Sequence, residues 1–176
     1  MEKTQTFIDR LETGELNEKL LDIYVDKDKL EYQKERYVEA IREYSKLFGD
    51  EVEAIFSAPG RSEIGGNHTD HQHGEVLAAS INDDAIAVVG KTDKNEINIL
   101  SKGYDMITVS LDELDKNEKE EGTTLSLIKG VLAKTKDNGH NIGGFNAYVT
   151  SNVLSGSGLS SSAAFETLIG TILSGL

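Results

Sequence analysis

The 176-residue sequence contains no cysteine and no tryptophan, and it has a single proline. The absence of cysteine excludes disulfides, thiolate zinc sites and cysteine nucleophiles. Basic residues are also few: 18 Lys and Arg oppose 31 Asp and Glu, which gives a formal net charge of −13. The negative electrostatic potential of such a chain repels the phosphate backbones of nucleic acids and anionic membranes. We therefore expect neither nucleic acid nor a membrane as a partner, so an anionic ligand must be attracted by a few local donors.

Long hydrophobic runs are missing as well. The first ten residues, "MEKTQTFIDR", lack the apolar segment of a signal peptide, and no stretch reaches the ~20 apolar residues of a membrane-spanning helix. Hydrophobic residues make up 38% and charged residues 28% of the chain, as in ordinary globular proteins. The length fits one domain, or one domain and part of another, and we expect a cytoplasmic location.

Helical spacing of apolar residues occurs in residues 31–48, where positions 37, 41, 44 and 48 share a face and Gly49 is placed to end the helix. A second helix is expected after Thr123 or Thr124, either of which can cap it, with its end near Asn138. The weaker pattern of residues 11–30 predicts short helices and turns.

Short segments rich in valine and isoleucine begin at Val52 and predict β-strands. Turn residues separate them, so we expect an antiparallel or mixed sheet. The predicted strands span residues 52–58, 75–81, 85–91, 96–101, 106–111 and 145–153. The acidic run of residues 112–122 is expected to be a solvated loop or the start of a helix.

Small residues fill the connection between the last predicted strand and a final apolar helix. They are Gly156, Ser157, Gly158, Leu159, Ser160, Ser161 and Ser162. Glycines let the backbone approach an anion, and a helix start offers unpaired N–H groups, so phosphate binding is one interpretation. A serine cap beside a glycine turn is the other. Neither the Walker A pattern nor the dinucleotide fingerprint matches, because the lysine and the third glycine that they require are missing.

Histidines gather in an earlier stretch, where His68, His71 and His73 lie within six residues together with Asp70. Three interpretations stay open. The cluster could be a zinc site, because imidazole and carboxylate groups are usual zinc ligands in hydrolases. It could be a polar turn, or a loop that binds a sugar or polyol, in which Asp70 accepts hydrogen bonds from two hydroxyls beside His68. The nearby Arg61 suits the orientation of a phosphate or carboxylate, and a structural salt bridge is equally compatible.

Taken together, these stretches resemble the galactokinase family of the GHMP small-molecule kinases. The segment "APGRSEIGGNHTDHQHGEVLAASI" is similar to the family signature, in which "APGR", "IGEHTDY" and "G-x-V-L" occur in the same order. The segment "GSGLSSSAA" is similar to the phosphate loop of the superfamily. The resemblance covers about residues 31–176 and implies the two-layer α+β fold of GHMP kinase N-terminal domains, akin to ribosomal protein S5 domain 2. That fold has a mixed, mostly antiparallel sheet with helices on one side; residues 1–30 are expected to precede it as an extension.

The resemblance also implies a function, the ATP-dependent phosphorylation of a sugar at its 1-position, with galactose as the expected sugar and Mg²⁺ as the metal. Arg61 is then catalytic, lying between the transferring phosphoryl group and the catalytic carboxylate. Arg61, Asn67, His68 and Asp70 bind the sugar in this scheme. Residues 156–162 bind the ATP phosphates, and Ser161 is the expected Mg²⁺ ligand.

Three substitutions depart from the family pattern: Asn67 replaces a glutamate, His71 a tyrosine, and Leu154 a frequent proline. The family's catalytic aspartate lies beyond the phosphate loop, and no residue of this sequence matches it. We therefore expect an N-terminal part that is truncated, inactive by itself and prone to self-association. Two alternatives stay open: a sugar sensor without catalysis, and a metal-dependent hydrolase that uses His68, His71 and His73.

Overall fold

The computed structural model describes residues 2–66, 73–154, 156 and 158–176. Its elements, in chain order, are β1 (Glu2–Lys3), α1 (Thr4–Glu12), α2 (Asn17–Tyr24), η1 (Lys27–Lys29), α3 (Leu30–Phe48), β2 (Glu51–Val52), β3 (Ala54–Gly65), β4 (Leu77–Thr92), β5 (Glu96–Ser101), β6 (Ile107–Ser110), η3 (Glu118–Glu120), α4 (Thr124–Asp137), β7 (Gly144–Ser151) and α5 (Ser161–Gly175). The predicted helices are confirmed as α3, α4 and α5. α3 ends at Gly49, whose φ is 96°, and Thr123 caps α4 by accepting a hydrogen bond from the Ser126 amide at 3.2 Å.

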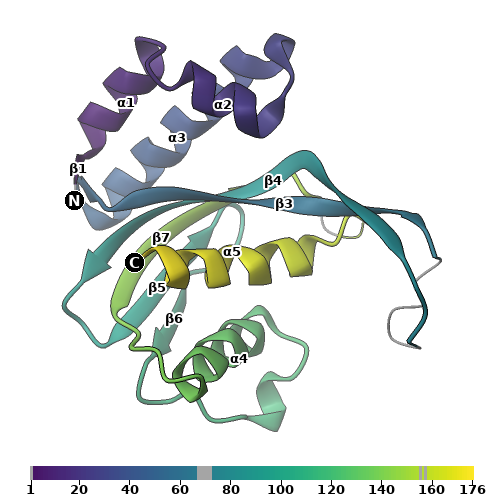
Figure 1. The fold of residues 1–176 in the computed structure, drawn as a ribbon. Helices are drawn as coiled ribbons and strands as arrows, with labels where there is room; N and C mark the ends of the chain where they lie inside the picture. Colours follow the sequence, from purple (N-terminus) through teal and green to yellow (C-terminus); the bar gives the residue numbers. More distant parts are fainter. Residues whose placement is uncertain (1, 67–72, 155, 157) are drawn as a thin grey trace.

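The main sheet has the strand order β3-β4-β7-β5-β6 (Figure 1). Neighbouring strands are antiparallel except for β5 and β7, which run parallel. The short strands β1 and β2 form a separate antiparallel ladder. The prediction of a mixed, mostly antiparallel sheet is therefore confirmed.

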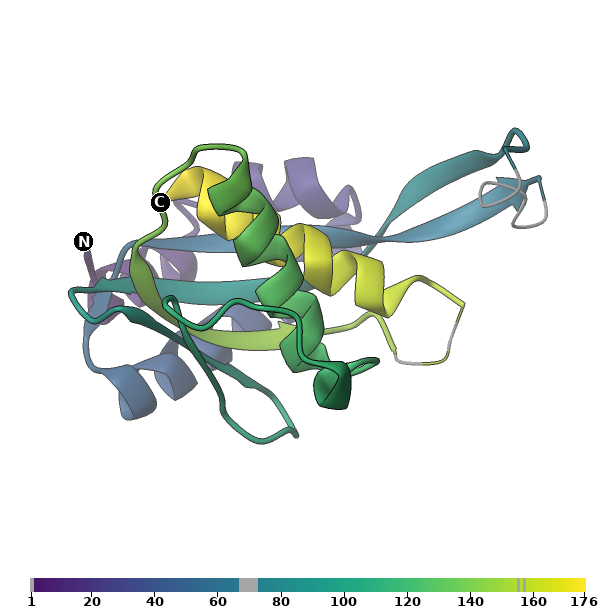
Figure 2. The ribbon, with the colours of Figure 1, turned by 90° about the horizontal axis from the view of Figure 1, so that it is seen from below.

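Helices cover both faces of this sheet, with α4 and α5 on one face and α1, α2 and α3 on the other (Figure 1). Figure 2, seen from below, shows α4 and α5 side by side. The central strand β4 explains the arrangement, because its apolar residues alternate between two cores: Ala87 and Val89 pack with α4 and α5, whereas Ile86 and Val88 pack with α1, α2 and α3. The prediction of helices on one side is right for α4 and α5 and wrong for α3.

The first two helices belong to the second of these cores. Ile8 and Leu11 of α1 and Leu20 of α2 are buried against Tyr37 and Ile41 of α3. The segment before residue 30 is thus packed onto α3 by apolar burial, each large side chain contributing about 1.5–3 kcal/mol. The domain boundary predicted at residue 30 stays a prediction.

Strand β4 also corrects one element of the prediction. Residues 75–81 and 85–91 were predicted as two strands, with a turn at the polar residues between them, but β4 runs through all of them from Leu77 to Thr92. The polar residues lie in a β-bulge. From the pair Pro59–Asp84 to the pair Arg61–Ser80 the sequence position changes by two on β3 but by four on β4, so β4 carries the extra residues.

Beyond this bulge, β3 and β4 continue as a two-stranded arm that projects from the body of the sheet (Figure 2). Two of its apolar side chains are exposed, Ile64 at 66% and Leu77 at 63%. An apolar surface of this kind is compatible with the expected self-association, which stays a prediction. Across the described ranges, none of the helices is both long and apolar enough to cross a membrane.

Gly90 lies where β4 meets α3 and β2, and we expect Gly90→Ala to lower the free energy of unfolding by about 1–3 kcal/mol. A Cβ at this position would overlap the Tyr44 hydroxyl and lie 2.7 Å from the Glu51 carbonyl oxygen. Gly130 of α4 is the matched control, because a Cβ there meets nothing within 4 Å, so Gly130→Ala should stabilise the chain by about 0.5–1 kcal/mol. Urea denaturation of both variants checks the prediction, and equal losses would contradict it.

Candidate functional site

The strand that carries Arg61 lies directly against the loop of small residues before α5. The Arg61 amide donates a hydrogen bond to the Leu159 carbonyl at 3.1 Å. The preceding residue, Gly60, allows this approach, since a Cβ there would lie 3.0 Å from the Val153 side chain and 3.1 Å from the Leu159 carbonyl oxygen. Two segments that are almost a hundred residues apart in sequence thus lie in direct contact.

The loop itself turns through left-handed backbone conformations into α5. Gly156 and Gly158 have φ of 75° and 77°, values that glycine adopts without strain. Ser160 has φ of 61° and accepts a hydrogen bond from the Ala164 amide at 2.9 Å, so the helix begins there. The first N–H groups of a helix have no partner within that helix, and its dipole makes this end positive. The described part of the loop therefore has the geometry of an anion-binding site.

A hollow of about 450 Å³ opens beside this helix start. Its walls include Ser161 and Ser162 of α5, Val153 after β7, and Lys102 and Tyr104 after β5. Tyr104 is 70% exposed, so its ring is available to a planar ligand, whereas the Lys102 ammonium is paired with Glu39 of α3 at 2.8 Å. An anion at the N-terminus of α5 could thus extend into a partly apolar pocket.

Arg61 carries a buried hydrogen-bond donor that has no partner in the part of the chain that the structure describes. Its side chain is half-buried, and its Nε atom is buried without a hydrogen-bond partner among the described residues. Arg36 Nε is also buried without a partner among the described residues, so the position of Arg61 beside the start of α5 is the observation that favours a binding role.

The predicted sugar-binding residues Asn67, His68 and Asp70 lie outside the described residues, as do His71 and Ser157. Their roles stay predictions. Of the three clustered histidines only His73 is described; it is exposed, with φ of 60°. Within the described ranges no group of three His, Asp or Glu side chains could hold a metal ion. This result does not test the zinc interpretation of the cluster.

Sequence reasoning missed a buried polar cluster behind this edge. Asp84, which is 2% exposed, accepts hydrogen bonds from Arg36 (2.5 Å), Tyr24 (2.7 Å) and Ser57 (2.5 Å). Burial raises the pKa of Tyr24 far above its ordinary value and that of Tyr37 to about 12, so both hydroxyls stay protonated. The position of Arg36, at helical spacing from the buried Gln33 and Ala40 of α3, was the available signal.

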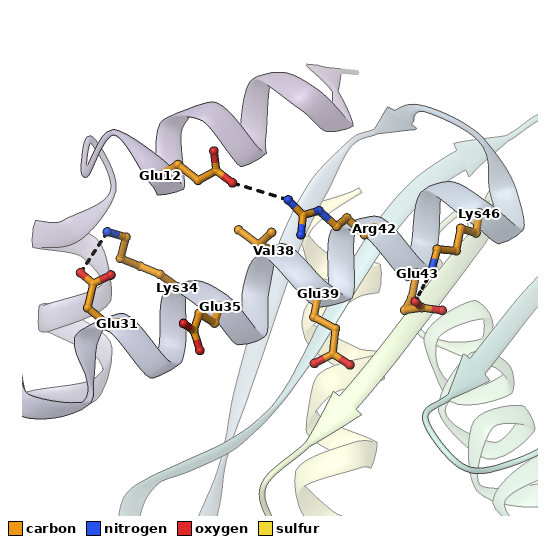
Figure 3. Close-up of a pocket in the computed structure, with 9 residues that line it drawn as sticks. All are labelled: Glu12, Glu31, Lys34, Glu35, Val38, Glu39, Arg42, Glu43 and Lys46. Atoms are coloured by element: carbon orange, nitrogen blue, oxygen red, sulfur yellow. Dashed lines mark hydrogen bonds and ion pairs between the residues drawn. The ribbon is translucent and has the colours of Figure 1, made fainter.

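Another hollow lies on the exposed face of α3, away from the site (Figure 3). Three ion pairs join six of its charged side chains: Arg42 with Glu12 at 3.6 Å, Lys34 with Glu31 at 3.0 Å, and Lys46 with Glu43 at 2.5 Å. A solvated helix face explains these charges, and we assign no site to this hollow.

Comparisons with known proteins find similarity to galactokinases. A family model described as the galactokinase galactose-binding signature matches residues 42–91. The galactokinase of Streptococcus mutans is 37% identical over 131 residues, which is 72% of this chain and 33% of that protein. The galactokinase of Ligilactobacillus salivarius is 33% identical over 133 residues, which is 73% of this chain and 34% of that protein. The chain thus spans about a third of the length of these curated relatives.

The chain is also similar to solved structures of a galactokinase and a mevalonate kinase. The galactokinase of Lactococcus lactis, complexed with galactose, is similar with a TM-score of 0.67 and 28% identity, covering 77% of this chain and 36% of that one. The mevalonate kinase of Methanococcus jannaschii is similar with a TM-score of 0.58 and 19% identity, covering 69% of this chain and 39% of that one. The second match supports the fold alone, which is that of the GHMP kinases.

Proposed function

The chain belongs to the galactokinase family, and we propose that it supplies the nucleotide- and sugar-binding part of an ATP-dependent sugar 1-kinase. The reaction is the transfer of the γ-phosphoryl group of ATP to the anomeric hydroxyl of a sugar, giving ADP and a sugar 1-phosphate. The single observation that carries this proposal is the contact between Arg61 and Leu159, which joins the two motifs in one place.

The nucleotide is proposed to bind with its phosphates at the start of α5. Backbone N–H groups of the loop and the positive end of the helix dipole would hold the β- and γ-phosphates locally, against the net charge of −13. Ser161 and Ser162 add hydroxyls, and we assign Ser161 to Mg²⁺, which prefers oxygen ligands and phosphates. The adjacent hollow, with Tyr104 at its rim, is large enough for the nucleoside.

Arg61 is proposed to act on the transferring phosphoryl group. Phosphoryl transfer depends mainly on positioning and on cations that stabilise charge in the transition state, and a guanidinium fork does both. The sugar is proposed to bind beyond Arg61, on Asn67, His68 and Asp70. The galactose complex of the L. lactis relative supports galactose as the sugar.

Calorimetric titration of the 176-residue chain with MgADP tests the nucleotide site. We expect binding, and we expect Ser161→Ala to weaken it roughly tenfold, because a hydrogen bond or metal contact to a charged group contributes about 1.5–3 kcal/mol. Ser126→Ala, in the first turn of α4, is the matched control and should leave the affinity unchanged. A chain that binds no MgADP, or equal affinities in all three proteins, would count against the proposed site.

A further inference from the structure

The buried cluster around Asp84 links the N-terminal helices to the back of the proposed site. Its side chains come from four elements: Tyr24 ends α2, Arg36 lies on α3, Ser57 on β3 and Asp84 on β4. Both carboxylate oxygens are used, because Arg36 donates to Oδ1, while Tyr24 and Ser57 donate to Oδ2. Arg36 is itself only 6% exposed.

Backbone bonds connect the same cluster to the loop before α5. The Asp84 carbonyl accepts a hydrogen bond from the Asn152 amide at 2.9 Å and from Arg36 Nη2 at 3.0 Å. Arg36 Nη2 also donates to the Thr150 carbonyl at 3.3 Å. Thr150 and Asn152 are the end of β7 and the start of the connection to Gly156. The direction in which the chain leaves the sheet toward the loop is therefore set by Arg36 and Asp84.

The cluster also fixes the strand that carries Arg61. Asp84 pairs with Pro59 in the register of β3 and β4, at the residue where the bulge begins. Asn82, within the bulge, donates from its side chain to the Tyr24 carbonyl at 3.3 Å, so the end of α2 holds the bulge at two points. Gly60 and Arg61 follow Pro59 directly and meet Leu159.

A buried ion pair is a costly way to fill this space, since desolvation of both charges offsets their attraction. Apolar side chains of similar size could fill it, but they would not define the direction of three hydrogen bonds. The planar guanidinium, by contrast, fixes a carboxylate and two carbonyls at set angles. The Arg36–Asp84 pair therefore fits a role in orienting these backbone segments better than a role in stabilising the fold alone.

We propose that Asp84, Arg36 and Tyr24 are positioning residues, which hold the Arg61 strand and the described part of the loop before α5, Gly156 and residues 158–162, at the separation that the nucleotide requires. The N-terminal helix α2 then affects the geometry of the site, although none of its side chains contacts the ligand. The inference rests on the proposed function for the identity of the ligand. The hydrogen-bonded connection from Tyr24 and Asp84 to the Arg61 strand does not depend on that function.

A pair of matched variants tests this link in the full 176-residue chain. Tyr24→Phe removes the hydroxyl that donates to Asp84, and Tyr44→Phe removes a hydroxyl that donates to the Glu51 carbonyl at 3.2 Å. Both tyrosines are 2% exposed and both lie in the same apolar core. These conservative changes are used because Asp84→Asn would leave Arg36 buried without its counter-charge.

Amide hydrogen exchange gives the first readout, as the ratio of the protection of the Arg61 amide to that of Leu132 in the core of α4. Tyr24→Phe is expected to lower this ratio roughly tenfold, a local loss of about 1.4 kcal/mol. Tyr44→Phe should leave the ratio unchanged. If Tyr24→Phe lowers both protections in the same proportion, the cluster is merely structural and the inference is overturned.

MgADP affinity gives the second readout. We expect Tyr24→Phe to weaken MgADP binding by roughly tenfold and Tyr44→Phe to leave it unchanged, at temperatures where each variant is fully folded. Equal affinities of the two variants would overturn the inference. If the wild-type chain binds no MgADP, the proposed function fails, and the exchange ratio alone decides whether the cluster positions Arg61.

Discussion

Arg36→Leu is expected to lower the free energy of unfolding of the chain by about 3–5 kcal/mol. The substitution leaves the Asp84 carboxylate, 2% exposed, without its counter-charge. It also removes the donors to the carbonyls of Asp84 and Thr150. Because a domain of this size has a total stability of about 5–15 kcal/mol, a loss of this size brings the chain close to unfolding. Urea denaturation followed by circular dichroism measures the effect.

Lys102→Leu is the matched control for this prediction. Lys102 also forms an ion pair with a carboxylate, that of Glu39 on α3, at 2.8 Å, but the two side chains are 56% and 58% exposed. Exposed pairs contribute little, so the expected loss is below about 1 kcal/mol. Similar losses for the two variants would show that burial does not control the strength of the Arg36–Asp84 pair.

The second large effect concerns catalysis. We expect the 176-residue chain, given galactose and MgATP, to form galactose 1-phosphate at least about a hundredfold more slowly than a complete galactokinase. The chain spans about a third of the length of its relatives, and the galactokinase resemblance implies a catalytic aspartate beyond the phosphate loop. A positioned acid or base contributes roughly 10²–10⁴-fold, so its loss alone predicts this deficit. A coupled assay for ADP, with product confirmed by mass spectrometry, checks the rate.

Two controls make the kinase assay decisive. The galactokinase of Lactococcus lactis, a structural relative, shows that the assay detects turnover. Arg61→Ala separates activity of the chain from that of a contaminant, since only the former depends on Arg61. Turnover close to that of the relative, lost in Arg61→Ala, would contradict the prediction of an inactive part while supporting the kinase chemistry. Galactose binding by the chain would show that it keeps the sugar site, whether or not the phosphoryl group is transferred.

Much of the fold could be predicted because local pattern and tertiary environment agree in most segments. The apolar spacing in α3, the threonine cap of α4 and the alternation in β5 and β6 each need only neighbouring residues to be read. The acidic run of residues 112–122 is a largely exposed connection with the short turn η3, as expected of charges that prefer water.

The fold predictions that failed are those in which contacts with distant residues outweigh the local sequence preference. The sequence Asn82-Asp83-Asp84 has the composition of a turn, but Arg36, 48 residues away, neutralises Asp84 and keeps it in the strand. The helices on both faces follow from β4, whose apolar run of residues 85–89 is fully buried on both sides. A run of this kind indicates burial on both faces, but it does not say which helices provide it.

The candidate site was predicted in part. The motifs indicate Arg61 and the loop before α5, and their roles stay predictions; the structure adds that the two segments are in contact through Leu159. The Tyr24, Arg36 and Asp84 cluster carries no motif, because its members are spread over three elements and meet only after folding. An arginine on the apolar side of an amphipathic helix was its one sequence signal.

The proposed function requires that Arg61 and the start of α5 belong to one nucleotide-binding site. A titration of the isotopically labelled chain with MgADP, followed by amide resonances, measures this. We expect the resonances of Gly156, Gly158, Ser161 and Arg61 to shift together with a single dissociation constant. Shifts confined to other regions, such as the charged face of α3 in Figure 3, or an Arg61 amide that stays unchanged at saturation, would contradict it.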